Sequence, residues 1–344
     1  MTTTEAGVTS HFRLAVLNPG GRDPEQDFSL GEKMTDKGHA PVNFHSYAAC
    51  TRGVFFRETK RAVAAGCPVL LLLRGDFKET QGALSELQKA GLPVAVSLKE
   101  TGLHQIAKQL GDPKRAGRFR EITAAANGCL AATPDALSFY PRGRFIPTPY
   151  PLDDPHWDFA SSLGERRGVF VGTREGDVPS RHHLAALVLA LGLGEPVTVF
   201  DENAANCRRQ LTALGLQMDG LRILERRLPF RHYLAEMARH KIVLQADKSG
   251  VPGQVAGDAL LCRMPCVGGD GAIDRLAFSR TCGHGRSLGE LRELAERLLH
   301  DPRFYGDVVA ESQKLGGEKA GFTAVAGQLA DFFRELARQA SASE

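Results

Sequence analysis

Short apolar runs alternate with amphipathic segments along most of this chain. In its first half we predict strands near residues 12–17, 42–45, 68–73, 93–97, 128–131 and 144–146, and helices near residues 49–65, 77–90, 102–110 and 115–126. In its second half we predict strands near residues 168–172, 197–201, 222–224, 242–245, 266–268 and 281–283, and helices near residues 181–191, 204–214, 230–239, 254–262 and 288–300. Strands that alternate with helices are typical of parallel sheets covered on both faces. The pattern therefore predicts an α/β protein with two Rossmann-like parallel-sheet lobes.

A segment with four prolines and a cluster of acids, "PTPYPLDDPHWDFASSLGER", separates the two halves. Such a composition ends regular structure and is typical of a connector. We therefore expect an N-terminal lobe over residues 1–150, a hinge over 151–166, a C-terminal lobe over 167–318 and a separate C-terminal segment over 319–344. That segment contains an amphipathic helix near residues 321–339, whose apolar side must pack on another part of the chain. The apolar positions are Phe322, Val325, Leu329, Phe332, Phe333 and Leu336.

Composition narrows the class of protein. The 344 residues are 42% hydrophobic and 24% charged, which is ordinary for a globular protein. The longest apolar run has the length of a strand, and the N-terminus lacks the features of a signal peptide, so we expect a cytoplasmic protein without a membrane span. Among the seven cysteines only Cys262 and Cys266 are close in sequence, which favours reduced thiols over a metal site. A net charge of +3 indicates no nucleic acid partner, although the basic segment 108–120 could make a peripheral membrane contact.

The first candidate anion site lies at the end of the strand "GVFVG". Gly172 and Thr173 are followed by Arg174, and Arg181 comes next to the start of a helix, with Ser180 as the expected N-cap. In parallel sheets, loops at the carboxyl ends of strands meet helix N-termini that favour phosphate. Two arginines there could bind a diphosphate and stabilise it as a leaving group, so Arg174 and Arg181 are our candidate catalytic cations. The alternative is a plain turn with solvated arginines.

The second candidate anion site is the stretch "ADKSGVPGQVAGDALLCRMPCVGG". A glycine at the entrance of a helix lets main chain approach a ligand, and a second one inside the helix lets helix and sheet approach closely. These are Gly253 and Gly257. Asp258, inside an apolar helix, needs a partner, and ribose hydroxyls would supply one, although a solvent-facing aspartate is the alternative. We predict that this loop and helix bind the donor through Lys248, Gly250, Val251, Pro252, Gly253, Gln254, Val255 and Asp258.

Further candidates lie at predicted strand ends outside these two stretches. Gly20 and Gly21 follow the first strand and would let backbone approach the donor. His45 is a candidate for acceptor contact and proton transfer, because imidazole exchanges protons near neutral pH. The acceptor-side candidates are His45, Arg74 and Asp76, and Glu225 is a candidate contact to the nucleoside. For His45 the alternative is a structural histidine, and for Asp76 it is helix capping.

These motifs together resemble glycosyltransferases of GT-B architecture, closest to glycosyltransferase family 4. "VGTREGDVPSRHH" corresponds to the family's strand ending in Gly-Arg, and "GVPGQVAGDALLCRMPCVGG" to its donor loop and following helix. The resemblance covers the C-terminal half nearly end to end and the N-terminal half more loosely. It implies two lobes facing a cleft, with the last helix returning to the N-terminal lobe.

The resemblance also implies an activity. It implies transfer of a sugar from a nucleotide-diphosphate donor, held by the C-terminal lobe, to a carbohydrate, lipid-linked or protein acceptor held by the other lobe. It implies retention of anomeric configuration, and neither a metal nor a separate cofactor. The first glutamate of the family motif falls on Gly250 and the second is shortened to Asp258. This departure leaves open a non-catalytic nucleotide-sugar-binding relative. A further alternative is a sugar-nucleotide epimerase, which shares the two-lobed architecture but would need its own catalytic carboxylates near the cleft.

Overall fold

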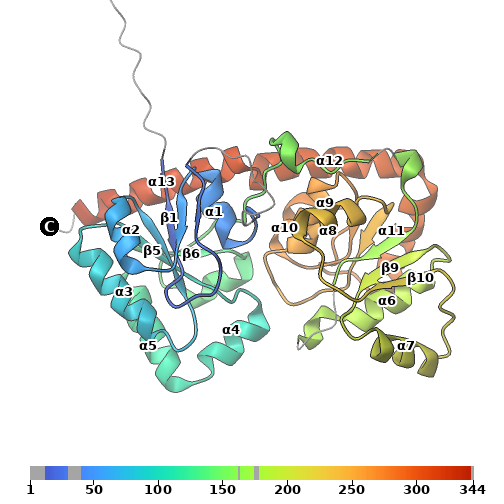
Figure 1. Ribbon diagram of the computed structural model, residues 1–344, viewed down its shortest axis with the longest axis horizontal. Helices are drawn as coiled ribbons and strands as arrows, with labels where there is room; N and C mark the ends of the chain where they lie inside the picture. Colours follow the sequence, from blue (N-terminus) through green and yellow to red (C-terminus); the bar gives the residue numbers. More distant parts are fainter. Residues whose placement is uncertain (1–11, 30–39, 162, 174–177, 342–344) are drawn as a thin grey trace, which may run out of the picture.

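A computed structural model describes residues 12–29, 40–161, 163–173 and 178–341, and the structural statements below concern these residues. They form two α/β lobes that lie side by side (Figure 1). The first lobe (the N-lobe) contains a seven-stranded sheet and the second (the C-lobe) a five-stranded sheet. The α/β class and the two parallel-sheet lobes predicted from the sequence are confirmed.

The N-lobe sheet has the strand order β2-β3-β1-β4-β5-β6-β7. All its neighbouring strands are parallel except β2 and β3. Its strands are β1 (Ala15–Leu17), β2 (Gln26–Asp27), β3 (Val54–Phe56), β4 (Val69–Leu73), β5 (Val94–Leu98), β6 (Gly128–Ala131) and β7 (Gly143–Phe145). Its helices are α1 (Phe44–Cys50), α2 (Thr59–Ala65), α3 (Lys78–Lys89), α4 (Leu103–Leu110), α5 (Pro113–Ala125) and the 3-10 helix η1 (Pro134–Phe139).

The C-lobe sheet is entirely parallel and has the strand order β10-β9-β8-β11-β12. Its strands are β8 (Val169–Val171), β9 (Val197–Phe200), β10 (Leu221–Leu224), β11 (Ile242–Leu244) and β12 (Cys266–Val267). The short 3-10 helices are η2 (Pro155–Trp157), η3 (Leu163–Glu165) and η4 (Pro179–Arg181). The α-helices of this half are α6 (His183–Leu191), α7 (Ala204–Ala213), α8 (Phe230–Met237), α9 (Gln254–Leu261), α10 (Ala272–Ala277), α11 (Leu288–His300), α12 (Pro302–Ala320) and α13 (Phe322–Ser341).

The core explains the unbroken apolar run of β4. Leu71 and Leu73 pack with residues of α2, α3 and α5 on one face of the sheet, whereas Leu70 and Leu72 pack with α1 and α13 on the other. Successive side chains of a strand point to opposite faces, so a strand covered on both faces is apolar throughout. The C-lobe sheet is enclosed in the same way by two apolar clusters.

The last two helices connect the lobes. α12 packs on α9, α10 and α11 of the C-lobe, and α13 continues along the N-lobe against α1 (Figure 1). Five apolar side chains of α13 complete the N-lobe core: Val325, Leu329, Phe332, Phe333 and Leu336. Where the chain passes from α12 to α13 it runs beside the first connection between the lobes. There the Tyr150 N–H donates to the Ala320 carbonyl over 2.8 Å, and the Phe322 N–H donates to the Tyr150 carbonyl over 3.1 Å.

Three sequence predictions about local structure were wrong. Residues 42–45 form no strand, since α1 begins at Phe44. Residues 49–65 are not one helix: α1 ends at Cys50, and β3 precedes α2. The turn between them requires Gly53, because a Cβ atom there would lie 1.9 Å from the Leu14 carbonyl oxygen. Residues 281–283 form a turn that bonds to the end of β12 instead of a strand; the Gly268 N–H donates to the Thr281 carbonyl over 2.8 Å.

Two further observations concern expectations made from composition. Within the described ranges, no helix combines the length and apolar character needed to cross a membrane. None of the seven cysteines, all of which lie in those ranges, forms a disulfide.

Candidate functional site

A pocket of about 540 Å³ lies between the lobes, at the carboxyl ends of the C-lobe strands β8, β9 and β11. It brings together nine of the residues predicted to bind a donor: Gly172, Thr173, Arg181, Val251, Pro252, Gly253, Gln254, Val255 and Asp258. These residues come from two loops about 70 positions apart in the chain, which meet because β8 and β11 are neighbours in the sheet. The two stretches singled out in the sequence therefore form one site.

The loop between β11 and α9, residues 245–253 (the donor loop), ends at Gly253, one of the two positions where the sequence predicted close approach. Gly253 has φ +90°, and a Cβ atom there would lie 2.9 Å from a carboxylate oxygen of Asp274. Only glycine adopts such a conformation without strain. Gly253 is also the N-cap of α9, and no side chain caps that helix. The first backbone N–H groups of α9, which have no intrahelical acceptor, thus lie at the pocket.

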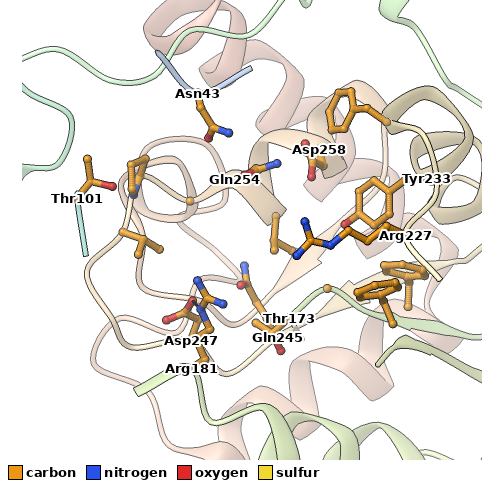
Figure 2. A pocket seen from close by; sticks show the side chains of 18 of the residues that line it. Asn43, Thr101, Thr173, Arg181, Arg227, Tyr233, Gln245, Asp247, Gln254 and Asp258 are labelled. Atoms are coloured by element: carbon orange, nitrogen blue, oxygen red, sulfur yellow. Dashed lines mark ion pairs between the residues drawn. The ribbon is translucent and has the colours of Figure 1, made fainter. Parts of the chain in front are cut away.

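Arg181 lies beside the donor loop on the pocket wall (Figure 2). Its Nε atom is 4.0 Å from a carboxylate oxygen of Asp247. Asp247 also accepts a hydrogen bond of 2.8 Å from the Ser249 N–H, which fixes the carboxylate in place. Within the described part of the chain this loose contact is the only ion pair of Arg181, which leaves most of its guanidinium donors available to an anion. The N-cap of α6 is His182, and not Ser180 as the sequence suggested.

Aromatic and apolar side chains line one end of the pocket. Phe170 and Phe230 both lie against Tyr233 there, and the ring centroids of Phe170 and Tyr233 are 5.7 Å apart. Phe200 and Leu228 also line the pocket. The rings of Phe230 and Tyr233 are stacked with centroids 6.3 Å apart. Arg227 lies at the same end, where its Nε donates to Glu202 over 2.8 Å. This end of the pocket suits a flat, partly polar ring.

Asp258 is a buried acid on the pocket wall near the aromatic end. Its residue exposure is 1%, and its Oδ1 atom has no hydrogen-bond partner among the described residues. Burial raises the pKa of this carboxyl well above the ordinary value. Figure 2 shows Asp258 on the same side of the pocket as Tyr233 and Arg227. A buried unpartnered carboxyl is costly, and a ligand hydroxyl would satisfy it.

A second buried acid, Asp274, does not line the pocket but bonds to Gln245, which does. It accepts hydrogen bonds from the Gln245 amide over 2.8 Å and from the Gly271 N–H over 3.1 Å. Burial, and secondly the charge of Asp247, raises the pKa of Asp274 to about 8. Gln245 itself lines the pocket, so Asp274 fixes the orientation of a pocket side chain.

The raised pKa of Asp274 predicts a pH dependence of stability. An unfolded aspartate has a pKa of about 3.9, so between about pH 4 and about pH 8 the native state binds a proton that the unfolded chain has lost. The free energy of unfolding should therefore fall as pH rises through this range, and Asp274→Asn should make that slope shallower. Denaturant titrations at pH 5, 6, 7 and 8 measure this slope.

The control is Asp301→Asn, which removes an exposed capping carboxyl with a lowered pKa and should leave the slope unchanged. Equal slopes in all three proteins would contradict the prediction.

Eight other predicted site residues that the structure describes do not line the pocket, and His45 is the clearest correction. His45 lies in α1 and is 3% exposed; its Nε2 donates a 2.8 Å hydrogen bond to the Pro24 carbonyl, and its ring stacks on Phe55. Its imidazole is enclosed by the N-lobe, so it has no access to a substrate. His45 therefore fits the alternative of a structural histidine.

The remaining N-lobe candidates bond to each other or to their neighbours. Arg74 donates to the Gly20 carbonyl. A Cβ atom at Gly20 would meet Glu79 and one at Gly21 would meet the side chain of Asn18, and neither glycine lines the pocket. Asp76 accepts from the Lys78 N–H over 3.2 Å at the start of α3 and pairs with Arg118.

The remaining C-lobe candidates are also turned away from the pocket. Glu225 is exposed outside it, and Lys248 is exposed with Nζ 3.5 Å from the Arg286 carbonyl. Gly250 has φ +60° and lies against Leu103 of the N-lobe. Arg174 falls outside the described residues.

Sequence reasoning missed about half of the pocket. The missed residues are Asn43, Thr101, Gln105, Phe170, Phe200, Arg227, Leu228, Phe230, Tyr233, Gln245 and Asp247. Gln245 and Asp247 had a local signal, because they directly follow the strand "KIVLQAD" that was already assigned to the site. The aromatic side chains come from β8, β9 and α8, and no local pattern distinguishes them from core residues.

Comparison with known proteins identifies the fold. No protein-family model and no curated protein matches the chain. Solved structures do match over nearly its full length. HepE of Anabaena in complex with UDP and glucose is 14% identical, with a TM-score of 0.60 over 94% of this chain and 100% of that one. The α,α-trehalose 6-phosphate synthase of Burkholderia multivorans is 9% identical, with a TM-score of 0.61 over 96% of this chain and 99% of that one.

A third structure comes from work on enzymatic glycosyltransfer with retention by trehalose-6-phosphate synthase. It is 10% identical, with a TM-score of 0.60 over 94% of this chain and 99% of that one. The chain has the GT-B fold. This confirms the architecture that the sequence motifs suggested, while the resemblance to family 4 stays a prediction.

The two lobes of this GT-B fold touch each other beside the pocket. The Leu103 N–H of the N-lobe donates to the Ser249 carbonyl of the donor loop over 3.0 Å. Arg275 of the C-lobe pairs with Asp135 of the N-lobe at 3.2 Å and with Asp270 at 2.5 Å. The pocket is thus closed on one side by direct contacts between the lobes.

Proposed function

We propose that this protein is a glycosyltransferase that takes a sugar from a nucleotide-diphosphate donor bound in the pocket between the lobes. The observation that carries the proposal is the order of groups across the pocket in Figure 2: Tyr233 at the aromatic end, then the buried carboxyl of Asp258 with its unpartnered oxygen, then Gln254 at the start of α9, and then Arg181. A nucleoside diphosphate presents a base, a ribose and a diphosphate in the same order. The bound UDP and glucose in HepE, which has this fold, agree with the proposal.

Each part of the donor has a matching group in the chain. The base would lie against Phe230 and Tyr233, and a ribose hydroxyl would donate to Asp258. The diphosphate would accept from the N–H groups that begin α9 and from Arg181. These positive groups supply what a metal ion would otherwise provide, so we propose metal-independent transfer.

The chemistry follows from stabilisation of the leaving group. The bond between the anomeric carbon and the diphosphate breaks, and its electron pair goes to the diphosphate, whose charge Arg181 and α9 offset. The acceptor hydroxyl forms the new bond to the same carbon and gives its proton to the departing diphosphate. Retention of configuration is part of the proposal, and it rests on the likeness to a synthase studied for glycosyltransfer with retention.

One observation favours a second candidate function, a binder that has lost catalysis. Gly250 stands where the resembling family has a glutamate. It has φ +60°, and a Cβ atom there would lie 3.1 Å from Leu103. A glutamate would be strained in this backbone conformation, so the loop is shaped for glycine. Any contact that the glutamate makes to the donor sugar must then come from another group or be absent.

Thermal unfolding in the presence of nucleotides tests the proposal. UDP-, GDP-, ADP- and dTDP-sugars would each be compared with the corresponding diphosphate and nucleoside, which separates the contributions of sugar, diphosphate and base. A ligand at a hundred times its Kd adds about 2.7 kcal/mol to the stability of the native state. We expect one base series to raise Tm, with the diphosphate more effective than the nucleoside. No shift by any compound at millimolar concentration would overturn the proposal.

Product analysis then separates the candidate functions. Release of free nucleoside diphosphate in the presence of an acceptor supports the transferase. Tight donor binding without release, across acceptors, supports the non-catalytic binder. Conversion of the donor without any acceptor would indicate the epimerase.

A further inference from the structure

The N-lobe contributes a small, neutral wall to the pocket. Of the described residues that line the pocket, three belong to the N-lobe: Asn43, Thr101 and Gln105. Figure 2 shows Asn43 and Thr101 on the side of the pocket away from Tyr233 and Arg227. If the nucleoside lies at the aromatic end, this wall faces the opposite part of the pocket, where the acceptor would lie.

Asn43 adopts a backbone conformation that is costly for any residue except glycine. Its φ is 53° and its ψ is −134°. It is the N-cap of α1, but its side chain makes no capping hydrogen bond. An asparagine N-cap normally bonds to the first turn of its helix, so this side chain is left for another use. Strain of this kind persists at binding sites, where the position of a side chain outweighs its backbone cost.

The charged side chains among the described residues that line the pocket all belong to the C-lobe. Arg181, Arg227, Asp247 and Asp258 are the charged residues among the described ones that line it, and all four are in the C-lobe. Lys99, two positions before Thr101, is already engaged: its Nζ is 2.9 Å from Asp23 and 5.4 Å from the centroid of the Phe44 ring. An acceptor phosphate or carboxylate would therefore meet no cation on the described N-lobe wall.

We propose that the acceptor is an uncharged polyhydroxy compound, such as a neutral sugar or sugar alcohol, bound through the Asn43 amide and the Thr101 hydroxyl. This inference rests on the proposed function. Amide and hydroxyl groups both donate and accept, so they match the hydroxyls of a polyol without placing a charge. Gln105 has a supporting role, because its amide bonds to the Gly102 N–H over 3.3 Å and to Glu100 over 3.2 Å and so orders the turn after Thr101.

The experiment uses the full chain and the nucleotide sugar that gives the largest thermal shift, with release of nucleoside diphosphate as the readout. The acceptor probes are glucose, maltose, myo-inositol and glycerol, compared with glucose 6-phosphate and glucuronate. The variant Asn43→Gly removes the side chain and relieves the backbone strain, so it should fold at least as well as the parent. Arg52→Gly is the matched control, since Arg52 also has a positive φ, of 50°, at the other end of α1, but does not line the pocket.

We expect a neutral polyol to stimulate release more than either charged probe. Asn43→Gly should raise the KM for that acceptor about tenfold, as expected for one lost hydrogen bond, and leave the KM for the donor unchanged. Arg52→Gly should change neither KM. Preference for glucose 6-phosphate or glucuronate, stimulation by none of the probes, or equal behaviour of the two variants would overturn the inference. If the nucleotide sugar still raises Tm while one of these outcomes is seen, the inference about the acceptor fails and donor binding stands. If no nucleotide sugar raises Tm, the proposed function itself fails.

Discussion

Arg181→Ala should weaken the binding of the preferred nucleoside diphosphate by about 1 to 3 kcal/mol, which is roughly a 5- to 150-fold rise in Kd. Arg181 lies on the pocket wall beside the donor loop, where the Lys248 N–H donates to the Ser180 carbonyl over 2.8 Å, and its guanidinium forms a loose ion pair with Asp247. The free nucleoside, which has no phosphate, should bind the variant and the parent equally. Isothermal titration with both ligands measures the difference.

A matched control for this prediction is Arg209→Ala. Arg209 is an exposed arginine of α7 whose guanidinium donates to Asn206 over 2.6 Å, and it does not line the pocket. The Arg209→Ala substitution changes the net charge of the protein by the same amount as Arg181→Ala. Comparing the two variants therefore cancels the long-range electrostatic contribution to diphosphate affinity. The stability of Arg181→Ala should change little, because a partly exposed ion pair contributes about 0 to 1 kcal/mol. Equal diphosphate affinity in the two variants would remove Arg181 from the site.

Gly257→Ala should destabilise the protein by about 3 kcal/mol. The glycine lies within α9, and a Cβ atom there would lie 1.8 Å from the ring of Tyr150. That ring has little freedom to move, because Tyr150 is 1% exposed and its backbone is paired with the segment between α12 and α13. The helix must shift instead, and the donor loop shifts with it. Denaturant unfolding measures the loss, and donor affinity should fall in parallel.

The control is Gly82→Ala in α3. Gly82 is exposed within a helix, and a Cβ atom there would contact nothing within 4 Å. Because alanine favours a helix over glycine by about 1 kcal/mol, this substitution should stabilise the protein. The same Gly→Ala substitution should therefore lower the free energy of unfolding at Gly257 and raise it at Gly82. A stabilised Gly257→Ala would show that α9 and Tyr150 are not in close contact.

The sequence predicts the sheets well because burial on both faces leaves an unmistakable pattern. β4 is five consecutive buried apolar residues, and the donor loop joins such a strand, β11, to a helix with glycine at its entrance. Both features are local. The prediction that α9 needs glycine for close packing was also correct in kind, although the contact is with Tyr150, which precedes the hinge, and not with the sheet.

The N-lobe wall shows why the rest of the site could not be predicted. Residues 42–45 alternate apolar and polar like a strand, but the left-handed φ of Asn43 turns the chain directly into α1. Nothing in the local sequence signals that conformation. His45, which has the more reactive side chain, was the natural candidate, yet the helix buries it and leaves Asn43 at the pocket. The φ angle of Asn43 therefore decides that Asn43, and not His45, reaches the pocket.

The pairing of Tyr150 with the segment before α13 also constrains how the molecule comes apart. The described part of the N-lobe is assembled from residues 12–29 and 40–146 together with α13, so its core is shared between two distant parts of the chain. A protease that cuts once in the connector after Tyr150 would leave both fragments held together through α13. The nicked protein should migrate as one species under native conditions and as two after denaturation. A fragment lacking α13 would present a bare apolar sheet face to water and should aggregate.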